Sequence, residues 1–242
     1  MKIVILVAGR GSRINRLTKK NPKALIKINK KTLLFHQLRA LKYAGIKKKN
    51  ISIVTGYQKE KFKKFKLKEF KNNEWRATNM IYSLNKANTW LSNNNCIVLY
   101  GDILYSYKAI KLLLNSKNKF CVLSNNNWLS NWKLRFSNPL KDLESFKIDK
   151  KKIIKEIGNK ETKIKNIKGQ FMGMFKIDPK NWKKIKLKFK ENNNNISTTK
   201  LLNKLIKEEK VKIKSVDYNQ QWFEIDSYND FKIAQKNFVE VI

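Results

Sequence analysis

The 242-residue sequence predicts an α/β fold with a mixed, mainly parallel central sheet sandwiched by helices and a small β-rich lid. Strand and helix patterns alternate over the first hundred residues, which is typical of parallel strands joined by crossover helices. Three of these strands run into a glycine, at Gly9, Gly56 and Gly101. Short strand patterns dominate the second half. With 41% hydrophobic residues and six Trp, we expect one folded domain over residues 1–242.

The first half supplies the parallel part of this sheet. Its first strand, KIVILV, is a continuous β-branched run, the mark of a strand buried on both faces. The first helix has apolar residues at helical spacing and ends at Gly45, a good residue for leaving a helix. In order, the predicted elements are a strand at 2–7, a helix at 32–45, a strand at 51–55, a Lys-rich helix, a helix at 79–91, a strand at 96–100 and a strand containing Cys121.

The second half is less regular, and it supplies the expected lid. A longer strand precedes Pro179, which is well suited to the first turn of a helix. The predicted strands are 132–136, 144–149, 152–157, 169–177, 211–216 and 221–226, with a turn at 149–151, a solvated loop at 191–195 and a final amphipathic helix to Ile242.

The chain is strongly basic, with 55 Lys plus Arg against 18 Asp plus Glu and a net charge of +37. Such a charge points to nucleic acid or to an anionic membrane. However, 49 of the 55 are Lys, and they are spread evenly, 23 in residues 1–121 and 26 in residues 122–242. Nucleic-acid sites are patches with Arg and aromatic residues interleaved. A compositional drift toward AT-rich codons explains the lysines better, so we expect no specific nucleic-acid partner.

The cysteines and the lengths of the apolar segments predict the cellular compartment. Cys96 and Cys121 lie within predicted strands, as small buried hydrophobic residues of a reduced compartment do. The apolar run at 3–7 is too short for a signal peptide, and no segment approaches the length of a membrane span. We therefore expect a cytoplasmic protein with no membrane partner.

The six arginines are distributed unlike the lysines. Three of them, Arg10, Arg13 and Arg16, crowd the loop after the first strand. Glycine-rich backbone there can form an anion-binding nest, and the arginine fork grips phosphate oxygens where lysine supplies only a point charge. The loop is neither a dinucleotide fingerprint, because Ile14 takes the third glycine position, nor a Walker loop. It predicts a polyphosphate ligand.

The stretch VAGRGSR…LT…NPKAL resembles the signature of nucleotidyltransferases that move NMP from an NTP onto a phosphorylated acceptor, with Val7 and Arg16 in place of the usual Ala and Pro. The resemblance implies the fold of that family, a triphosphate held by the glycine loop, and Arg13 and Lys23 as the catalytic cations. The nucleotide-binding residues that it implies are Val7, Ala8, Gly9, Gly11, Ser12, Gly56, Asn79, Ser83 and Gly101.

Two carboxylates complete the site that the family uses. Asp102 follows the third strand, and Asp226 follows WFEI. By resemblance this pair would hold Mg²⁺, a cation that prefers oxygen ligands and bridges phosphates. A turn or helix-capping role is the alternative, and it carries more weight for Asp226 because Ser227 starts a helix. The single histidine, His36, lies in a predicted helix and is interpreted as structural.

A finer resemblance covers nearly the whole chain. The stretches at 75–84, 128–147, 155–160, 169–177 and 222–226 are similar to cytidylyltransferases that act on phosphoglutamine, 2-aminoethylphosphonate or phosphocholine. Phosphoglutamine, a precursor of capsular polysaccharide phosphoramidate, is the favoured acceptor, and CTP the favoured nucleotide. Residues 1–125 would form the nucleotide-binding part and 126–242 the acceptor-binding part and lid. The implied acceptor-binding residues are Trp128, Trp132, Arg135, Gln170 and Glu224.

Some alternatives remain open. The family often has an acidic residue where Leu143 stands, between Asp142 and Glu144, and this departure leaves the acceptor undecided. A sugar-1-phosphate nucleotidyltransferase is the second interpretation within the enzyme class, and a basic nucleic-acid-binding protein is the alternative from another class. The sequence also leaves the oligomeric state open, with a homodimer as one option.

Overall fold

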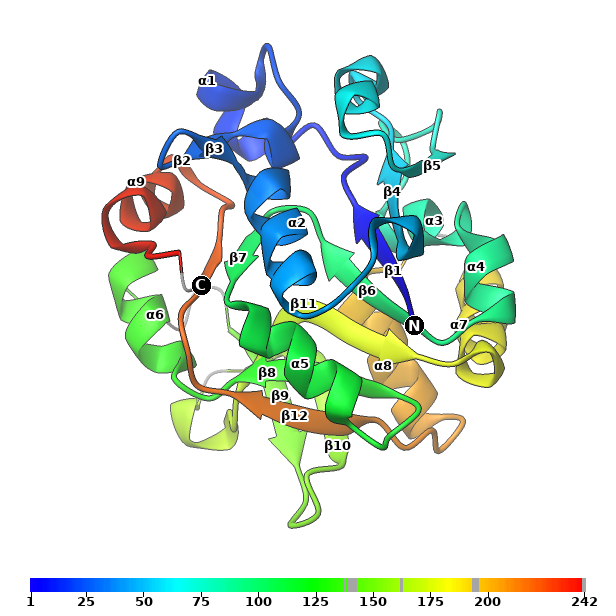
Figure 1. Ribbon diagram of the computed structural model, residues 1–242. Helices are drawn as coiled ribbons and strands as arrows, with labels where there is room; N and C mark the ends of the chain where they lie inside the picture. Colours follow the sequence, from blue (N-terminus) through cyan, green and yellow to red (C-terminus); the bar gives the residue numbers. More distant parts are fainter. Residues whose placement is uncertain (137, 139–142, 162, 193–195, 241–242) are drawn as a thin grey trace.

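A seven-stranded sheet forms the centre of the protein, which we describe from a computed structural model over residues 1–136, 138, 143–161, 163–192 and 196–240. The strand order is β12-β8-β11-β6-β1-β4-β5 (Figure 1). Strand β11 pairs antiparallel with both of its neighbours, and the other neighbouring strands pair in parallel. The predicted mixed, mainly parallel sheet is therefore confirmed.

The seven strands of the central sheet are β1 (Lys2–Leu6), β4 (Ile51–Thr55), β5 (Lys68–Lys71), β6 (Cys96–Tyr100), β8 (Cys121–Asn125), β11 (Gln170–Ile177) and β12 (Lys214–Tyr218). Three two-stranded sheets flank it: β2 (Lys27–Ile28) with β3 (Lys31–Thr32), β7 (Ile103–Tyr105) with β13 (Trp222–Glu224), and β9 (Glu144–Ile148) with β10 (Ile154–Lys160). The β9–β10 hairpin corresponds to the β-rich segment expected in the second half.

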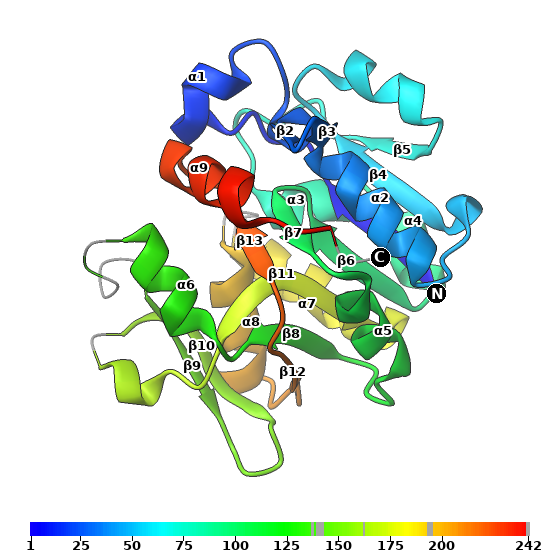
Figure 2. The ribbon, with the colours of Figure 1, turned by 60° about the vertical axis from the view of Figure 1, so that its left-hand side comes forward.

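Helices cover both faces of the central sheet. The α-helices are α1 (Asn15–Thr18), α2 (Leu33–Tyr43), α3 (Met80–Asn85), α4 (Asn88–Asn93), α5 (Tyr107–Asn115), α6 (Trp128–Arg135), α7 (Pro179–Glu191), α8 (Thr198–Lys207) and α9 (Tyr228–Asn237). Figure 1 shows α2 and α5 in front of the sheet and α7 and α8 behind it. In Figure 2, α6 and α9 lie together at the edge of the molecule, beside β13.

Local chemistry explains where the principal elements begin and end. Helix α2 starts where the Thr32 hydroxyl accepts a hydrogen bond from Phe35 N–H, and it is followed by Gly45 at φ 88°. Helix α7 starts at the predicted proline, behind the Asp178 cap. The central strands β1 and β6 are almost wholly buried, which is why they appear in the sequence as continuous apolar runs.

The predicted strand at 132–136 is wrong, because residues 132–135 belong to helix α6 and Phe136 is its C-cap. Trp128 and Trp132 stand four residues apart, so on a helix they share one face, and their rings meet edge to face with centres 6.4 Å apart. The Phe136 ring lies tilted against Trp132 at 6.1 Å. Trp132 also stacks on Trp222 at 5.9 Å. Burial of these rings on one helical face decides the local structure.

Other boundaries differ from the prediction. The expected helix at 79–91 is broken into α3 and α4 at Lys86 and Ala87. The Lys-rich helix is a 3₁₀ helix over Lys59–Phe65, and the edge strand β5 follows it without having been predicted. Strand β12 starts three residues after the predicted 211. The final helix, predicted to run to Ile242, ends at Asn237. Residues 193–195 of the predicted loop and 241–242 of the predicted helix lie outside the described residues.

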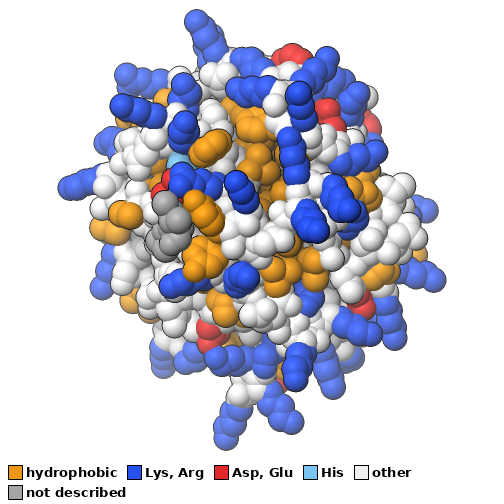
Figure 3. All heavy atoms as spheres, viewed as in Figure 1, with side chains coloured by type: hydrophobic (Ala, Val, Ile, Leu, Met, Phe, Trp, Pro, Cys, Tyr) orange, Lys and Arg blue, Asp and Glu red, His pale blue; other side chains and the backbone are white. Residues whose placement is uncertain are grey.

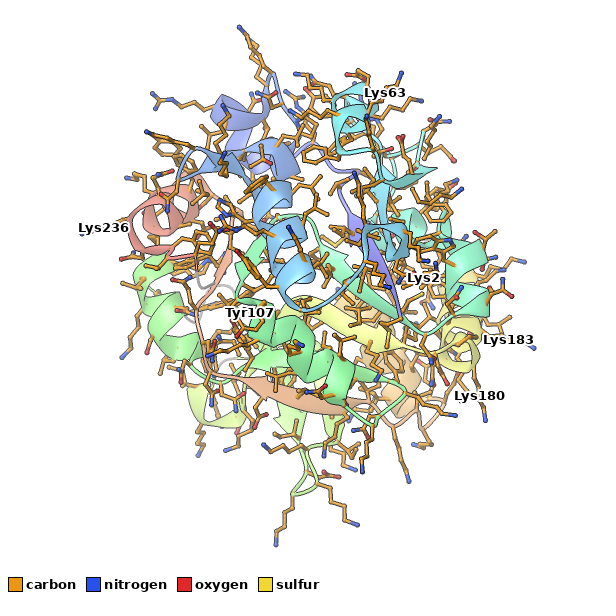
Figure 4. All side chains as sticks on the ribbon, in the orientation of Figure 1. Lys2, Lys63, Tyr107, Lys180, Lys183 and Lys236 are labelled. Atoms are coloured by element: carbon orange, nitrogen blue, oxygen red, sulfur yellow. The ribbon has the colours of Figure 1, made fainter. Side chains whose placement is uncertain are left out.

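The basic side chains surround the molecule. Figure 3 shows Lys and Arg over all parts of one face, and in Figure 4 Lys63, Lys236 and the α7 residues Lys180 and Lys183 project outward at different sides of the molecule. The charge is thus dispersed, without a single stripe on this face. Over the ranges described above, no helix is long and apolar enough to cross a membrane.

Candidate active site

The loop after β1 is folded back on itself around Gly11. This residue has φ 78°, a region in which side chains are strained, and a Cβ here would lie 2.9 Å from Cβ of Lys23. The buried Thr18 hydroxyl closes the loop by donating to the Gly11 carbonyl at 2.9 Å. The glycine therefore allows the Lys23 side chain to pass directly beneath the loop.

Lys23 joins the two predicted carboxylates. Its Nζ lies 2.6 Å from Asp102 Oδ2 and 2.5 Å from Asp226 Oδ1. Arg13 adds a second cation, with Nη2 at 2.9 Å from the same Asp226 oxygen. Asp102 and Asp226 stand 79 and 203 positions after Lys23 in the sequence. The three side chains meet at the carboxyl ends of β1 and β6.

The electrostatics of this cluster follow from burial and from the opposite charges. The Lys23 side chain is 12% exposed, and burial by itself would lower its pKa, but Asp102 and Asp226 raise the pKa to about 12. Burial likewise acts to raise the pKa of Asp226, and the charge and hydrogen bond of Lys23 reverse this, so the pKa of Asp226 is lowered. A charged lysine therefore lies between the two carboxyl groups and favours the ionised form of Asp226.

Gly101 allows the ends of β1 and β6 to lie close together beside the Lys23 cluster. Its N–H donates to the Leu6 carbonyl at 2.9 Å, and a Cβ at this position would lie 2.5 Å from the same carbonyl oxygen. Only glycine permits that approach. Gly56 lies against the Ala8 carbonyl and Trp75 at the end of β4.

A cavity of about 340 Å³ lies above the loop. A Cβ at Gly9 would meet nothing within 4 Å, so the backbone is open to this cavity. Of the predicted nucleotide-binding residues, Ser12 and Gly56 are absent from its wall, and the others line it. The lining residues are Leu6, Val7, Ala8, Gly9, Gly11, Arg13, Lys23, Ala24, Trp75, Thr78, Asn79, Met80, Ser83, Gly101 and Asp102.

Asn79 holds one wall of this cavity in place. Its Oδ1 caps α3 by accepting from Tyr82 N–H at 3.0 Å, and its Nδ2 donates to the Ile196 carbonyl at 3.1 Å. The Ser83 hydroxyl accepts from Nδ2 of the buried Asn72 at 3.0 Å. Sequence reasoning missed Trp75, although the residue lies in the similar stretch 75–84; a tryptophan among polar residues before a helix cap was the available signal.

A second cavity, of about 390 Å³, shares Arg13, Asn79 and Met80 with the first. Its wall includes three of the predicted acceptor-binding residues, Trp132, Gln170 and Glu224, together with Asp226. Also lining it are Tyr100, Glu144, Phe171, Gly173, Ser197, Thr198 and Thr199. The two cavities therefore meet beside the Lys23 cluster.

Trp128 and Arg135 lie behind this second cavity, outside its lining residues. The Trp128 side chain is buried against Trp132. Arg135, with a side chain only 8% exposed, pairs with Asp230 at 2.8 Å and with Glu224 at 3.2 Å. Burial and the charge of Asp226 raise the pKa of Glu224 to about 8, against the lowering effect of Arg135. The predicted acceptor contact of Arg135 stays a prediction.

The donor set at Asp102 and Asp226 fits a divalent cation. Both carboxylates converge on one cation, Lys23 Nζ, and the buried Asp102 Oδ1 has no hydrogen-bond partner among the described residues. Within those residues, no group of three or more His, Cys, Asp or Glu side chains could hold a metal. A cation here would thus take two protein carboxylates and complete its shell from a ligand.

His36 lies away from this cluster, on α2. Its Nε2 is 2.9 Å from the Ile28 carbonyl oxygen, and its ring packs edge to face on Phe238 at 4.9 Å. These contacts agree with the structural role expected for it.

Comparison with known proteins places this geometry in a family. The MobA-like NTP transferase domain matches residues 3–154. The CTP:phosphoglutamine cytidylyltransferase of Campylobacter jejuni is 30% identical over 254 residues, covering 96% of this chain and 98% of that protein. The choline-phosphate cytidylyltransferase of Streptococcus pneumoniae is 37% identical over 101 residues, covering 40% and 43%.

Solved structures support the same fold. The CTP:phosphocholine cytidylyltransferase from Streptococcus pneumoniae aligns with a TM-score of 0.71 at 20% identity, covering 97% of each chain. The inositol-1-phosphate CTP transferase from T. maritima aligns with a TM-score of 0.71 at 17% identity, covering 99% of this chain and 98% of that one. The chain accordingly belongs to the MobA-like NTP transferase family and is a nucleotidyltransferase.

Proposed function

We propose that this protein is a Mg²⁺-dependent cytidylyltransferase that transfers CMP from CTP to a small phosphorylated acceptor, with phosphoglutamine as the best candidate. The observation that carries the proposal is the meeting of two cavities at Lys23, Asp102 and Asp226. One cavity would hold the nucleotide and the other the acceptor, so that the phosphates of both meet at the cluster.

The reaction needs little proton transfer. A phosphate oxygen of the acceptor attacks the α-phosphorus of CTP, a new P–O bond forms, the α–β bridging bond breaks, and pyrophosphate leaves. The attacking oxygen is already an anion at neutral pH, so no general base is required, in keeping with the remote place of His36. Catalysis then rests on positioning and on neutralising charge.

The cations would act at the phosphates in two ways. Lys23, fixed beneath the glycine loop, would contact phosphate oxygens of the nucleotide. Arg13, whose side chain is 72% exposed, presents guanidinium donors to both cavities. Asp102 and Asp226 would hold the divalent ion, which when bound supplies positive charge to the phosphate oxygens.

The acceptor cavity favours a substrate that carries a cationic group. Only 18 residues of this chain are acidic against 55 basic ones, yet Glu144, Glu224 and Asp226 line this cavity with Arg13 as its basic residue. Glu224, with a pKa of about 8, and Asp226, paired with Lys23 and Arg13, add little net charge at neutral pH, so Glu144 is the carboxyl group of this cavity that would meet an ammonium group on the acceptor.

The hydrogen-bonding groups of the cavity favour a primary ammonium over a trimethylammonium. Trp132, the largest aromatic residue in the wall, already has the Arg135 guanidinium 4.7 Å from its ring centre and Trp222 stacked at 5.9 Å. A quaternary ammonium needs free aromatic faces. A primary ammonium needs acceptors, and Glu144, Gln170 and Thr199 supply carboxylate, amide and hydroxyl oxygens. Phosphoglutamine and 2-aminoethylphosphonate both have such a group.

The test is pyrophosphate release with Mg²⁺ across four NTPs and four acceptors: phosphoglutamine, 2-aminoethylphosphonate, phosphocholine and a hexose 1-phosphate. We expect release with CTP and an acceptor carrying a primary ammonium. Glu144→Gln should raise the KM for that acceptor and leave the KM for CTP unchanged. Equal rates with phosphocholine would contradict the ammonium argument, and release with none of the first three would contradict the proposal.

A second candidate is a sugar-1-phosphate nucleotidyltransferase. The probable glucose-1-phosphate cytidylyltransferase of Bacillus subtilis is 33% identical over 94 residues, covering 37% of this chain. A sugar phosphate has no cationic group, and the acidic wall of the second cavity offers it less than it offers an aminated acceptor. Turnover of hexose 1-phosphate alone in the same panel would select this candidate.

A further inference from the structure

A buried ion cluster connects helix α6 to the strand end that carries Glu224 and Asp226. Arg135, at the last turn of α6, donates from Nε to Asp230 Oδ1 at 2.8 Å and from Nη2 to Asp230 Oδ2 at 3.3 Å. Its third group, Nη1, donates to Glu224 Oε2 at 3.2 Å. One guanidinium therefore holds two carboxylates that come from different elements.

Asp230 in turn holds the backbone at Asp226. Its Oδ2 accepts from the N–H groups of Asp226 at 3.0 Å and Ser227 at 2.8 Å, and the Ser227 hydroxyl accepts from Asp230 N–H at 3.1 Å. This reciprocal capping box fixes the corner between β13 and α9. The carboxylate that fixes the corner is itself fixed by Arg135.

We propose that Arg135 and Asp230 are a positioning pair, which aims Asp226 at Lys23 and Glu224 into the acceptor cavity without touching either substrate. Only a planar fork can bond both oxygens of one carboxylate and still reach a second carboxylate, which explains an arginine here in a chain that has 49 lysines. Asn229 strengthens the connection, since its Nδ2 donates to the Arg135 carbonyl at 3.1 Å.

A purely stabilising ion pair is the competing explanation. Replacing a whole buried ion pair by apolar residues of similar volume costs little stability, but removing Arg135 alone leaves the buried Asp230 unpaired and lowers stability. Arg135 also packs over the rings of Trp132 and Phe136, so a methionine could keep much of that packing. If Arg135 positions Asp226 and Glu224, Arg135→Met lowers turnover. If the ion pair only stabilises the fold, the same substitution lowers the melting temperature and leaves turnover unchanged.

The test compares Arg135→Met with Arg39→Met. Arg39 is a matched control because it also pairs with a carboxylate, Glu240 at 2.7 Å, and packs on a ring, Tyr43, away from the cavities. Arg135→Met should lower kcat about 10- to 100-fold and raise the acceptor KM, since a misplaced group can cost up to about 100-fold. The Kd for CTP, measured by tryptophan fluorescence, and the turnover of Arg39→Met should remain unchanged.

Asp230→Asn and Arg135→Lys extend the test if Arg135→Met does not fold. Asparagine still accepts a backbone N–H but loses the charge that holds Arg135, and lysine cannot form the fork, so both should lower kcat as well. Combined with Arg135→Met, Asp230→Asn should add no further loss, because the pair acts as a unit. The proposal is overturned if the losses in kcat of Arg135→Met and Asp230→Asn add fully in the double variant. It is also overturned if these variants keep kcat and only have a lower melting temperature.

The inference rests on the role proposed for Asp226. The Asp226→Asn variant tests that role separately from the positioning role of Arg135 and Asp230. An inactive Asp226→Asn beside a fully active Arg135→Met overturns the positioning pair alone. A fully active Asp226→Asn overturns the role of Asp226 and, with it, this inference. Loss of kcat in both variants, with CTP binding retained, supports both.

Discussion

Lys23→Met removes the cation that lies between Asp102 and Asp226. Methionine is similar in length and fills irregular space well, so the loop should keep its packing beneath Gly11. What is lost is the charge: Lys23 Nζ stands 2.6 and 2.5 Å from the two carboxylate oxygens, and these side chains are only 12% and 17% exposed. After the substitution the two carboxylates face each other, and only Asp226 keeps a cation, Arg13.

The size of the effect follows from this burial. Removing one partner of a buried ion pair costs about 3–5 kcal/mol. Because Arg13 still neutralises Asp226, we expect the lower end, about 3 kcal/mol. In a chain of this length each kcal/mol shifts the melting temperature by about 2–4 °C, so the fall should be about 6–12 °C. Turnover should fall by about 10²–10³, as when one preorganised donor is lost from an oxyanion site.

Thermal unfolding with and without millimolar MgCl₂ measures the prediction. If Asp102 and Asp226 hold the divalent ion, Mg²⁺ should raise the melting temperature of Lys23→Met more than that of the wild type, because it replaces the missing charge without competing with Lys23. Lys86→Met is the control, since Lys86 pairs with the exposed Glu74 and should cost about 0–1 kcal/mol. A melting temperature within about 2 °C of the wild type, or an equal response to Mg²⁺, would refute the reasoning.

Further predictions concern the metal, the base, the thiols and the surface. Asp102→Ala should abolish pyrophosphate release and keep the far-UV circular dichroism spectrum; full activity would exclude the metal role. CTP should change the fluorescence of Trp75, which lines the nucleotide cavity, so Trp75→Phe should remove that change and Trp90→Phe should keep it. Cys96 and Cys121 are buried, and burial raises the pKa of Cys96 to about 12, so both thiols should react with a thiol reagent at pH 8 only after unfolding. Any RNA binding should vanish with moderate salt and survive Asp102→Ala.

The sheet could be predicted from the sequence because its central strands carry their own signal. Strands β1 and β6 are buried on both faces and therefore appear as continuous apolar runs that end in glycine. Helix α6 was missed because its two buried residues, Trp128 and Trp132, are aromatic, and aromatic residues favour strands as a class. Its spacing, Trp128 to Trp132, carried the helical signal that residue type concealed.

The candidate site could be predicted only where a local motif marks it. The glycine loop and Lys23 lie within one short stretch, and the resemblance pointed to Asp102 and Asp226. The partners of Arg135 could not be found in this way, because Asp230 stands 95 residues further along the chain and meets Arg135 only after α6 and α9 pack together. From the sequence alone, an arginine near two tryptophans predicts a ligand contact, and its carboxylate partners appear only in the fold.

Most arginines of this chain place the planar guanidinium group over an aromatic ring. Five of the six guanidinium groups lie 4.7 to 5.8 Å from an aromatic ring centre, namely Arg10 on Tyr57, Arg16 on Tyr228, Arg39 on Tyr43, Arg76 on Trp75 and Arg135 on Trp132. Arg10 also donates to Asn15 Oδ1 at 2.7 Å. Two of the three arginines crowded into the glycine loop thus hold the loop and its neighbours.

Arg13 differs from both of its neighbours in the loop. Among the described residues its recorded partner is Asp226, through one nitrogen, and its side chain is 72% exposed at the junction of the two cavities. A guanidinium has five N–H donors, so most of them face solvent here and can turn to phosphate oxygens. Of the three clustered arginines, Arg10 and Arg16 therefore stabilise the loop and its surroundings, whereas Arg13 is exposed to both cavities.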